Sequence, residues 1–195
     1  MMPPKAKITA EMIAEAGFQL VRESGFEALN IRSVAKKLGC STQPVMYHYH
    51  TAEALKAAVF AQADAFHTAF LMQPPAAGEN PLLCIGLRYI RFAAEERDLF
   101  RFLFQSGMLP DTPLAALTAA PENAPLLEAV AAEAKLTPEQ AEAVFALLFM
   151  TVHGCACLLA NNALQYDAAY CKKLLTRSLF GAVAAVKGEE HEEAL

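Results

Sequence analysis

Hydrogen-bonding side chains are expected to gather on the outward face of one short helix, which the sequence predicts from Ser41 or Thr42 to about His48. Val45 and Tyr49, spaced i and i+4, are expected to face inward. The side chains then left outside are Thr42, Gln43, Pro44, Tyr47 and His48. Glutamine bonds adenine at two positions, threonine and proline pack on thymine methyl groups, and tyrosine and histidine bond phosphate oxygens. The pattern predicts contacts with double-stranded DNA.

Two further helices are expected to hold this face in position. The first is amphipathic, begins after the N-cap residue Thr9 and ends at Gly25. The second begins after Asn30, another good N-cap, and ends at Gly39, which supplies the left-handed residue of a tight turn. Two short helices joined by such a turn predict a helix-turn-helix, whose second helix enters the DNA major groove.

Charge is unevenly distributed along the 195 residues. Residues 1–50 carry six basic and four acidic side chains, a net charge of +2, whereas residues 51–195 carry −7. This asymmetry indicates that the first fifty residues meet a polyanion. Arg32 and Ser41 complete the predicted DNA-binding set. Lys36, Lys37 and a flexible arm with Lys5 and Lys7 add positive charge, although a solvated surface is an equal alternative for Lys36 or Lys37 taken singly.

The first fifty residues resemble the DNA-binding domain of TetR/AcrR transcriptional regulators. The likeness runs from Ile13 to Phe26 and from Asn30 to Ser41, and it continues through Pro44–Tyr49 to Leu55 without a gap. The resemblance implies an all-α protein with a three-helix DNA-binding domain over 1–50. It also implies a homodimer, a palindromic operator and a helical ligand-binding and dimerisation domain over 51–195, in which 51–73 is the connecting helix.

Three residues depart from the pattern of this family. Met46 stands where the family usually has a phosphate-contacting tyrosine, Ala52 where it usually has a lysine, and Tyr49 where it usually has phenylalanine. Tyr47 can compensate for Met46 from the next position. Fewer phosphate contacts weaken non-specific binding and flatten its salt dependence, so we expect tight binding only at a specific operator.

The rest of the chain predicts further helices, because no alternating β pattern occurs. The segment Tyr89–Phe104 and the triplet Val152-His153-Gly154 resemble a C-terminal domain of these regulators, with valine in place of the tryptophan of a Trp-His-Gly signature. A small apolar effector is expected to bind between helices, and the candidate ligand-binding residues are Tyr89, Phe104, Phe149, His153 and Cys157. No third ligand joins the i, i+4 pair of His153 and Cys157, so neither a metal nor another cofactor is predicted.

The last two expected helices, the first opening at Thr137 and the second capped by Asp167 and reaching Lys187, are predicted to form the homodimer interface. Small residues such as Gly154 and Gly181 allow close approach, and leucines and valines supply apolar contacts. An acidic, frayed tail is expected after Lys187.

Other functions are less well supported by the residue patterns. No motif of catalytic residues, phosphate-binding loop or dinucleotide site is present, so catalytic residues are not predicted. A helical enzyme without short motifs remains an alternative. The uncharged stretch 143–160 predicts a buried helix and no membrane association, the alternative being a membrane-tethered regulator. Five cysteines without framework spacing and no signal peptide predict reduced thiols in a cytoplasmic protein.

Overall fold

The computed structural model describes residues 8–75, 78–109, 113, 116, 118–162 and 164–193, with side chains to residue 188. These residues form helices joined by turns and loops, and none of them lies in a strand. The predicted all-α fold is therefore confirmed. Lys5 and Lys7, the expected arm, lie outside the described residues.

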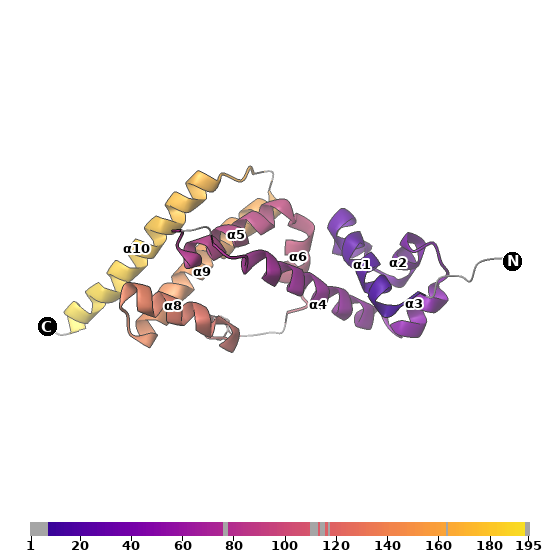
Figure 1. The fold of residues 1–195 in the computed structure, drawn as a ribbon, viewed down its shortest axis with the longest axis horizontal. Coiled ribbons are helices and arrows are strands. Elements are labelled where there is room, and N and C mark those ends of the chain that lie inside the picture. Colours follow the sequence, from indigo (N-terminus) through magenta and orange to yellow (C-terminus); the bar gives the residue numbers. More distant parts are fainter. Residues whose placement is uncertain are drawn as a thin grey trace. The chain divides into compact units, whose positions relative to one another are not determined.

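The first helices begin and end where local signals predict. They are α1 (Ala10–Ser24), the 3₁₀ turn η1 (Phe26–Ala28), α2 (Ile31–Lys37) and α3 (Thr42–His48), and α1 to α3 form one group in Figure 1. Thr9 Oγ1 accepts a hydrogen bond from the Met12 amide at 3.3 Å, and Asn30 Oδ1 accepts one from the Ser33 amide at 3.0 Å. Gly39 has φ of 65° between α2 and α3, a conformation that glycine adopts without strain.

The chain divides into two compact units. Unit 1 comprises Met1–Ala69 and Glu96–Leu109, and unit 2 comprises Phe70–Glu95 and Pro110–Leu195. Unit 1 therefore adds most of α4 (Ala52–Leu71) and α6 (Arg97–Gln105) to the three N-terminal helices. The expected functional boundary between residues 50 and 51 lies just before the start of α4 and remains a proposal. The two compact units instead divide after Ala69, Glu95 and Leu109.

Aromatic rings form part of the core of unit 1, together with aliphatic side chains such as Ile13 and Val59. Edge-to-face ring pairs join Phe18 to Phe66 and Phe60 to Phe102, with centroids 5.4 and 5.6 Å apart. Gly17 lets α1 approach α4, because a Cβ atom at this position would lie 2.5 Å from Val59 Cγ2. The side chain of Arg22 on α1 pairs with Glu96 at the start of α6. Helices α1, α4 and α6 are thus held together behind α2 and α3.

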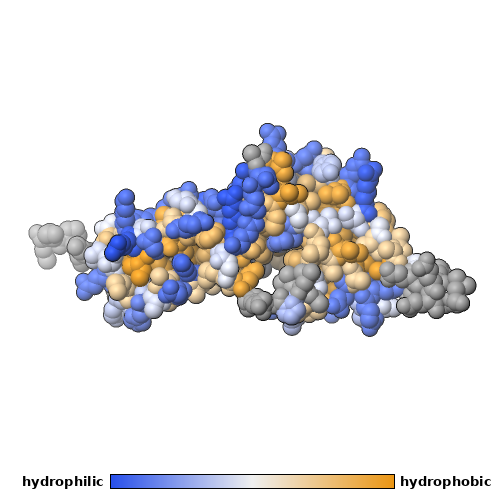
Figure 2. Space-filling view, turned by 180° about the vertical axis from the view of Figure 1, so that it is seen from behind, coloured by the Kyte–Doolittle hydropathy of each residue, from blue (hydrophilic) through white to orange (hydrophobic). Residues whose placement is uncertain are grey.

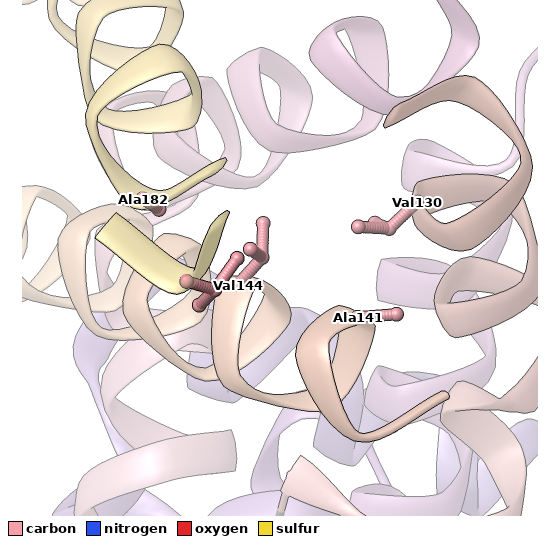
Figure 3. Packing of buried hydrophobic residues seen from close by; sticks show 5 residues of the cluster. Val130, Ala141, Val144 and Ala182 are labelled. Carbon is pink, nitrogen blue, oxygen red and sulfur yellow. The ribbon is translucent and has the colours of Figure 1, made fainter. Parts of the chain in front are cut away.

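Among the described residues, unit 2 contains α5 (Pro81–Glu95), the 3₁₀ turn η2 (Pro121–Asn123), α8 (Ala124–Ala134), α9 (Pro138–Asn161) and α10 (Ala168–Glu193). The predicted capping box of Thr137 and Gln140 is present, and Asp167 Oδ1 caps α10 by accepting from the Tyr170 amide. Val130 of α8, Val144 of α9 and Ala182 of α10 belong to one buried cluster, seen from close by in Figure 3.

Two features of unit 2 differ from the sequence-based expectation. The predictions assigned no element to residues 126–136, yet α8 extends to Ala134. The second difference is that α10 continues to Glu193, whereas the sequence predicted an end at Lys187 and a frayed tail. Gly188 keeps a negative φ and glutamate is a good helix former, so one glycine does not end the helix.

Among the described residues, α9 is the one helix long and apolar enough to cross a membrane by length and composition. The core helix of a globular protein passes the same test. In this protein, only 28% of the most apolar stretch of α9 is buried, so α9 has an apolar face that the chain itself does not cover.

Candidate functional site

Helix α3 presents the predicted DNA-binding side chains to solvent. Tyr47 is 75% exposed, and Gln43 is exposed four residues before it on the same face. Thr42 and Pro44 are half-buried at the start of the helix. Ser41 is the exposed N-cap residue, yet its side chain makes no capping bond, so its hydroxyl is left for another partner. The helix offers donors, acceptors and a ring on one accessible face.

The inward side of α3 is anchored as expected. Val45 is fully buried, and the Tyr49 hydroxyl donates to the Ala10 carbonyl at 3.1 Å. Burial is the main cause that raises the pKa of Tyr49, so its hydroxyl stays protonated and remains a donor. This bond gives a reason for tyrosine at this core position, because phenylalanine could pack there but not donate.

His48 makes a contact within the protein that the sequence did not predict. Its Nε2 atom lies 3.1 Å from the Ile8 carbonyl oxygen, and its ring packs edge-on against Tyr47. The tautomer with hydrogen on Nε2 donates to this carbonyl and fastens α3 to the segment before α1. Met46, noted in the sequence only as a departure, is 50% exposed and adds a thioether beside Tyr47.

The basic side chains of α2 are not equivalent. Lys37 Nζ lies 2.7 Å from Glu23 Oε2 on α1, so its charge is already paired. Arg32 and Lys36 are exposed and form no ion pair with any described residue. Free cations next to α3 attract phosphate groups, so Arg32 and Lys36 are better placed for DNA backbone contacts than Lys37.

Three of the five predicted effector residues come together in unit 2. The hydroxyl of buried Tyr89 on α5 lies 2.9 Å from Nδ1 of His153 on α9, and Phe149 stacks on the His153 ring with centroids 5.6 Å apart. Burial raises the pKa of Tyr89 and lowers that of His153, so both rings are neutral near pH 7. Tyr89 then donates to Nδ1, and the imidazole hydrogen resides on Nε2.

The other two predicted effector residues differ from each other in their surroundings. Cys157 is one turn beyond His153 on α9 and acts electrostatically on Tyr89, so it belongs to the same neighbourhood. Phe104 belongs to unit 1, where its ring packs against Phe100 and His67. In the part of the chain that the structure describes, no three histidine, cysteine, aspartate or glutamate side chains are grouped as metal ligands.

His67 is a polar residue of unit 1 that the sequence analysis missed. It is buried on α4, and desolvation lowers its pKa from 6.5 to about 4. The signal was present in the series Leu55, Val59, Ala63 and His67, which repeats every four residues and is buried throughout. An imidazole in this apolar series is neutral at physiological pH.

The outer faces of α9 and α10 combine large apolar side chains with glycines. Leu158 is 56% exposed and Phe180 is 70% exposed, while Gly154 and Gly181 lie nearby in sequence and are also exposed. A surface hollow of about 480 Å³ is lined by Leu147, Met150 and other residues of α9 together with Thr118. Figure 2 shows hydrophobic residues reaching the surface at several places.

A helix-turn-helix with an exposed second helix and a helical body defines a DNA-binding regulator. The family model for the C-terminal domain of tetracyclin repressor-like proteins matches residues 82–179, half of the chain, and the chain belongs to this TetR family. Its members regulate transcription by binding DNA. The membership favours DNA binding over catalysis.

Two solved structures are similar to this chain, and the first of them agrees with this fold. A transcriptional regulator from Rhodococcus sp. Rha1 is similar with a TM-score of 0.61 and 22% identity, over 91% of this chain and 97% of that chain. AmtR from Mycobacterium smegmatis has a TM-score of 0.40 and 18% identity, over 96% of this chain and 98% of its own. No curated protein matches the chain.

Proposed function

We propose that this protein is a cytoplasmic, ligand-responsive repressor that binds a palindromic operator as a homodimer. The observation that carries the proposal is the exposed face of α3, with Gln43 and Tyr47 accessible while Val45 is fully buried. Two such helices, one from each subunit, would enter successive major grooves about 34–36 Å apart. Arg32 and Lys36 would hold the phosphate backbone, and Gln43 would bond a base edge.

Dimerisation through α9 and α10 is the second part of the proposal. Leu158 and Phe180 are large apolar side chains left in water by the single chain, and such faces mark protein interfaces. Exposed Gly154 and Gly181 allow helices of a partner to approach closely. A four-helix bundle from two α9–α10 pairs would cover these side chains.

The effector is proposed to be a small apolar molecule with one polar group, bound beside Tyr89, Phe149 and His153. Their aromatic rings supply apolar contact, and the Tyr89–His153 bond supplies a polar group that a ligand can exchange for its own. Residues of α4 belong to both compact units, so a change at its end in unit 2 would be transmitted to unit 1. Release of DNA requires different effector affinities in the two states, and a coupling of about 1–3 kcal/mol is typical.

The proposal is tested by selecting bound duplexes from random DNA with the full-length protein. We expect a palindrome from the wild type, and a relaxed half-site preference from Gln43→Ala and from Tyr47→Ala. Loss of one bidentate base contact costs about 1–3 kcal/mol. Gln165→Ala is the matched control, because Gln165 is exposed outside unit 1. An unchanged preference in Gln43→Ala and Tyr47→Ala would assign the base contacts to another element.

A further inference from the structure

The seam between α9 and α10 has a register that several independent contacts define. Gln140 Nε2 near the start of α9 donates to the Val186 carbonyl of α10 at 3.4 Å. Ala141 and Val144 of α9 share a buried cluster with Ala182 and Val186 of α10 (Figure 3). Further along, a Cβ atom on Gly86 would lie 3.5 Å from Val152 Cγ2 and 3.2 Å from Leu175 Cδ1. The two helices are therefore antiparallel.

One more layer of this seam brings two cysteines to the same level. Val144 and Ala182 share the buried cluster, and Val152 and Leu175 both border Gly86 of α5. Between these two levels the chain advances eight residues along α9 and goes back seven along α10, so steps of three or four residues match on the two helices. The next step leads from Val152 to Cys155 and from Leu175 to Cys171. Cys171 is buried like Leu175, and Cys155 is half-buried. The two thiols thus occupy facing positions between packed helices.

Electrostatics agrees with this placement. The Cys155 thiol is one of the groups, after burial, that raise the pKa of Cys171, whereas none of the groups that shift Cys171 is Cys84 or Cys157. Cys157 instead acts on Tyr89 of α5. All five cysteines are free thiols. Because burial raises the pKa of both Cys155 and Cys171, the pair stays protonated and reduced in the absence of an oxidant.

We propose that Cys155 and Cys171 are a disulfide-forming pair that hydrogen peroxide oxidises, fastening α9 to α10. Cys155 is the more accessible sulfur, and its small thiolate fraction attacks one peroxide oxygen, slowly because burial raises the pKa of this thiol. Cys155 becomes a sulfenic acid, with water released after proton transfer. The Cys171 thiolate then attacks the Cys155 sulfur and displaces a second water. Overall, two thiols lose two electrons and two protons, and one peroxide yields two waters.

The bond has a measurable physical consequence. It closes a loop that contains the end of α9, the connecting residues and the first turn of α10. The closed loop runs from Cys155 to Cys171. Closing it restricts the unfolded chain, and the corresponding rise in Tm for a protein of this size is about 5–10 °C.

The test treats the full-length protein with hydrogen peroxide and maps its thiols by mass spectrometry. Cys155, Cys157 and Cys171 share one tryptic peptide, because no lysine or arginine lies between Lys135 and Lys172. Cleavage before Asp167 separates Cys171 from the other two. We expect loss of two hydrogens, a Cys155–Cys171 link and the higher Tm, all reversed by a thiol reductant.

Matched variants make the assignment specific. Cys157→Ser keeps the link and the Tm shift, whereas Cys155→Ser and Cys171→Ala lose both. If Cys171→Ala is poorly folded, Cys155→Ser alone decides, since Cys155 is half-buried and tolerates a hydroxyl. A link between Cys155 and Cys157, a link to Cys84, or sulfinic acid at Cys155 with no link would overturn the proposal.

Discussion

The surface of α2 and α3 and the surface of α9 and α10 differ in the side chains that they leave in water. The first exposes Gln43, Tyr47 and unpaired cations above a closed core, and the second exposes Leu158 and Phe180. Polar and cationic groups retain their hydration and suit a phosphate backbone, whereas exposed apolar groups gain free energy only when another surface covers them. The contrast indicates two kinds of partner for one chain.

The largest effect is expected from a change in the apolar surface of α9 and α10. Phe180→Glu places a charge in the proposed dimer face, so we expect a monomer of 21.1 kDa by analytical ultracentrifugation. Operator affinity should fall by at least about 100-fold, because each half-site is then bound without the other. Leu109→Glu is the control, since Leu109 is also an exposed large apolar residue but lies in unit 1. A dimeric Phe180→Glu protein would place the interface elsewhere.

The second effect concerns the core behind α2 and α3. The pKa of His67 is about 4 in the folded protein and about 6.5 when unfolded, so the unfolded state binds the proton first as pH falls. The contribution of His67 to the unfolding free energy is therefore fully present above pH 6.5 and is lost progressively as pH falls toward 4. The loss at pH 5 amounts to about 2 kcal/mol relative to pH 7.

Urea denaturation at pH 7 and pH 5 measures this loss. His67→Leu removes the titrating group. The change in its unfolding free energy between pH 7 and pH 5 should therefore be about 2 kcal/mol smaller than that of the wild type. His50→Leu, a change at an exposed position of unit 1, should behave as the wild type. Equal pH dependence in the wild type and His67→Leu would contradict the assignment.

Two helix caps, one in each unit, separate an effect on DNA binding from an effect on overall stability. Asn30→Ala removes the cap of α2 and Thr137→Ala removes that of α9, and each should cost about 1 kcal/mol of unfolding free energy. Only Asn30→Ala should also weaken operator binding, because α2 supports α3. Thermal unfolding and fluorescence anisotropy with operator DNA check the two effects. Equal weakening by both variants would mean that binding reports only global stability.

The smallest expected effect distinguishes two neighbouring lysines. Lys36→Ala removes an unpaired cation and should lower DNA affinity a few-fold, with a salt slope flatter by about one phosphate contact per subunit. Lys37→Ala removes a charge already paired with Glu23 and should change the slope less. Anisotropy titrations at several salt concentrations measure both slopes. A larger effect of Lys37→Ala would reverse this assignment.

Local chemistry explains why much of the architecture was predictable. The caps at Thr9, Asn30 and Thr137, and the turn at Gly39, depend on residues three or four positions apart, and the structure has them where the sequence predicts. The inward orientation of Val45 follows from helical periodicity in the same way. The outward face of α3 was accordingly visible from the sequence.

The sequence alone determined which segments become helices and which face of each is apolar, because hydrogen bonding and periodicity act over a few residues. Only the tertiary structure decided that His48 bonds the Ile8 carbonyl, that Phe104 packs with His67, and that Tyr89 bonds His153. These pairings join residues tens of positions apart. They depend on the register in which side chains of neighbouring helices interlock, and no short-range pattern encodes that register.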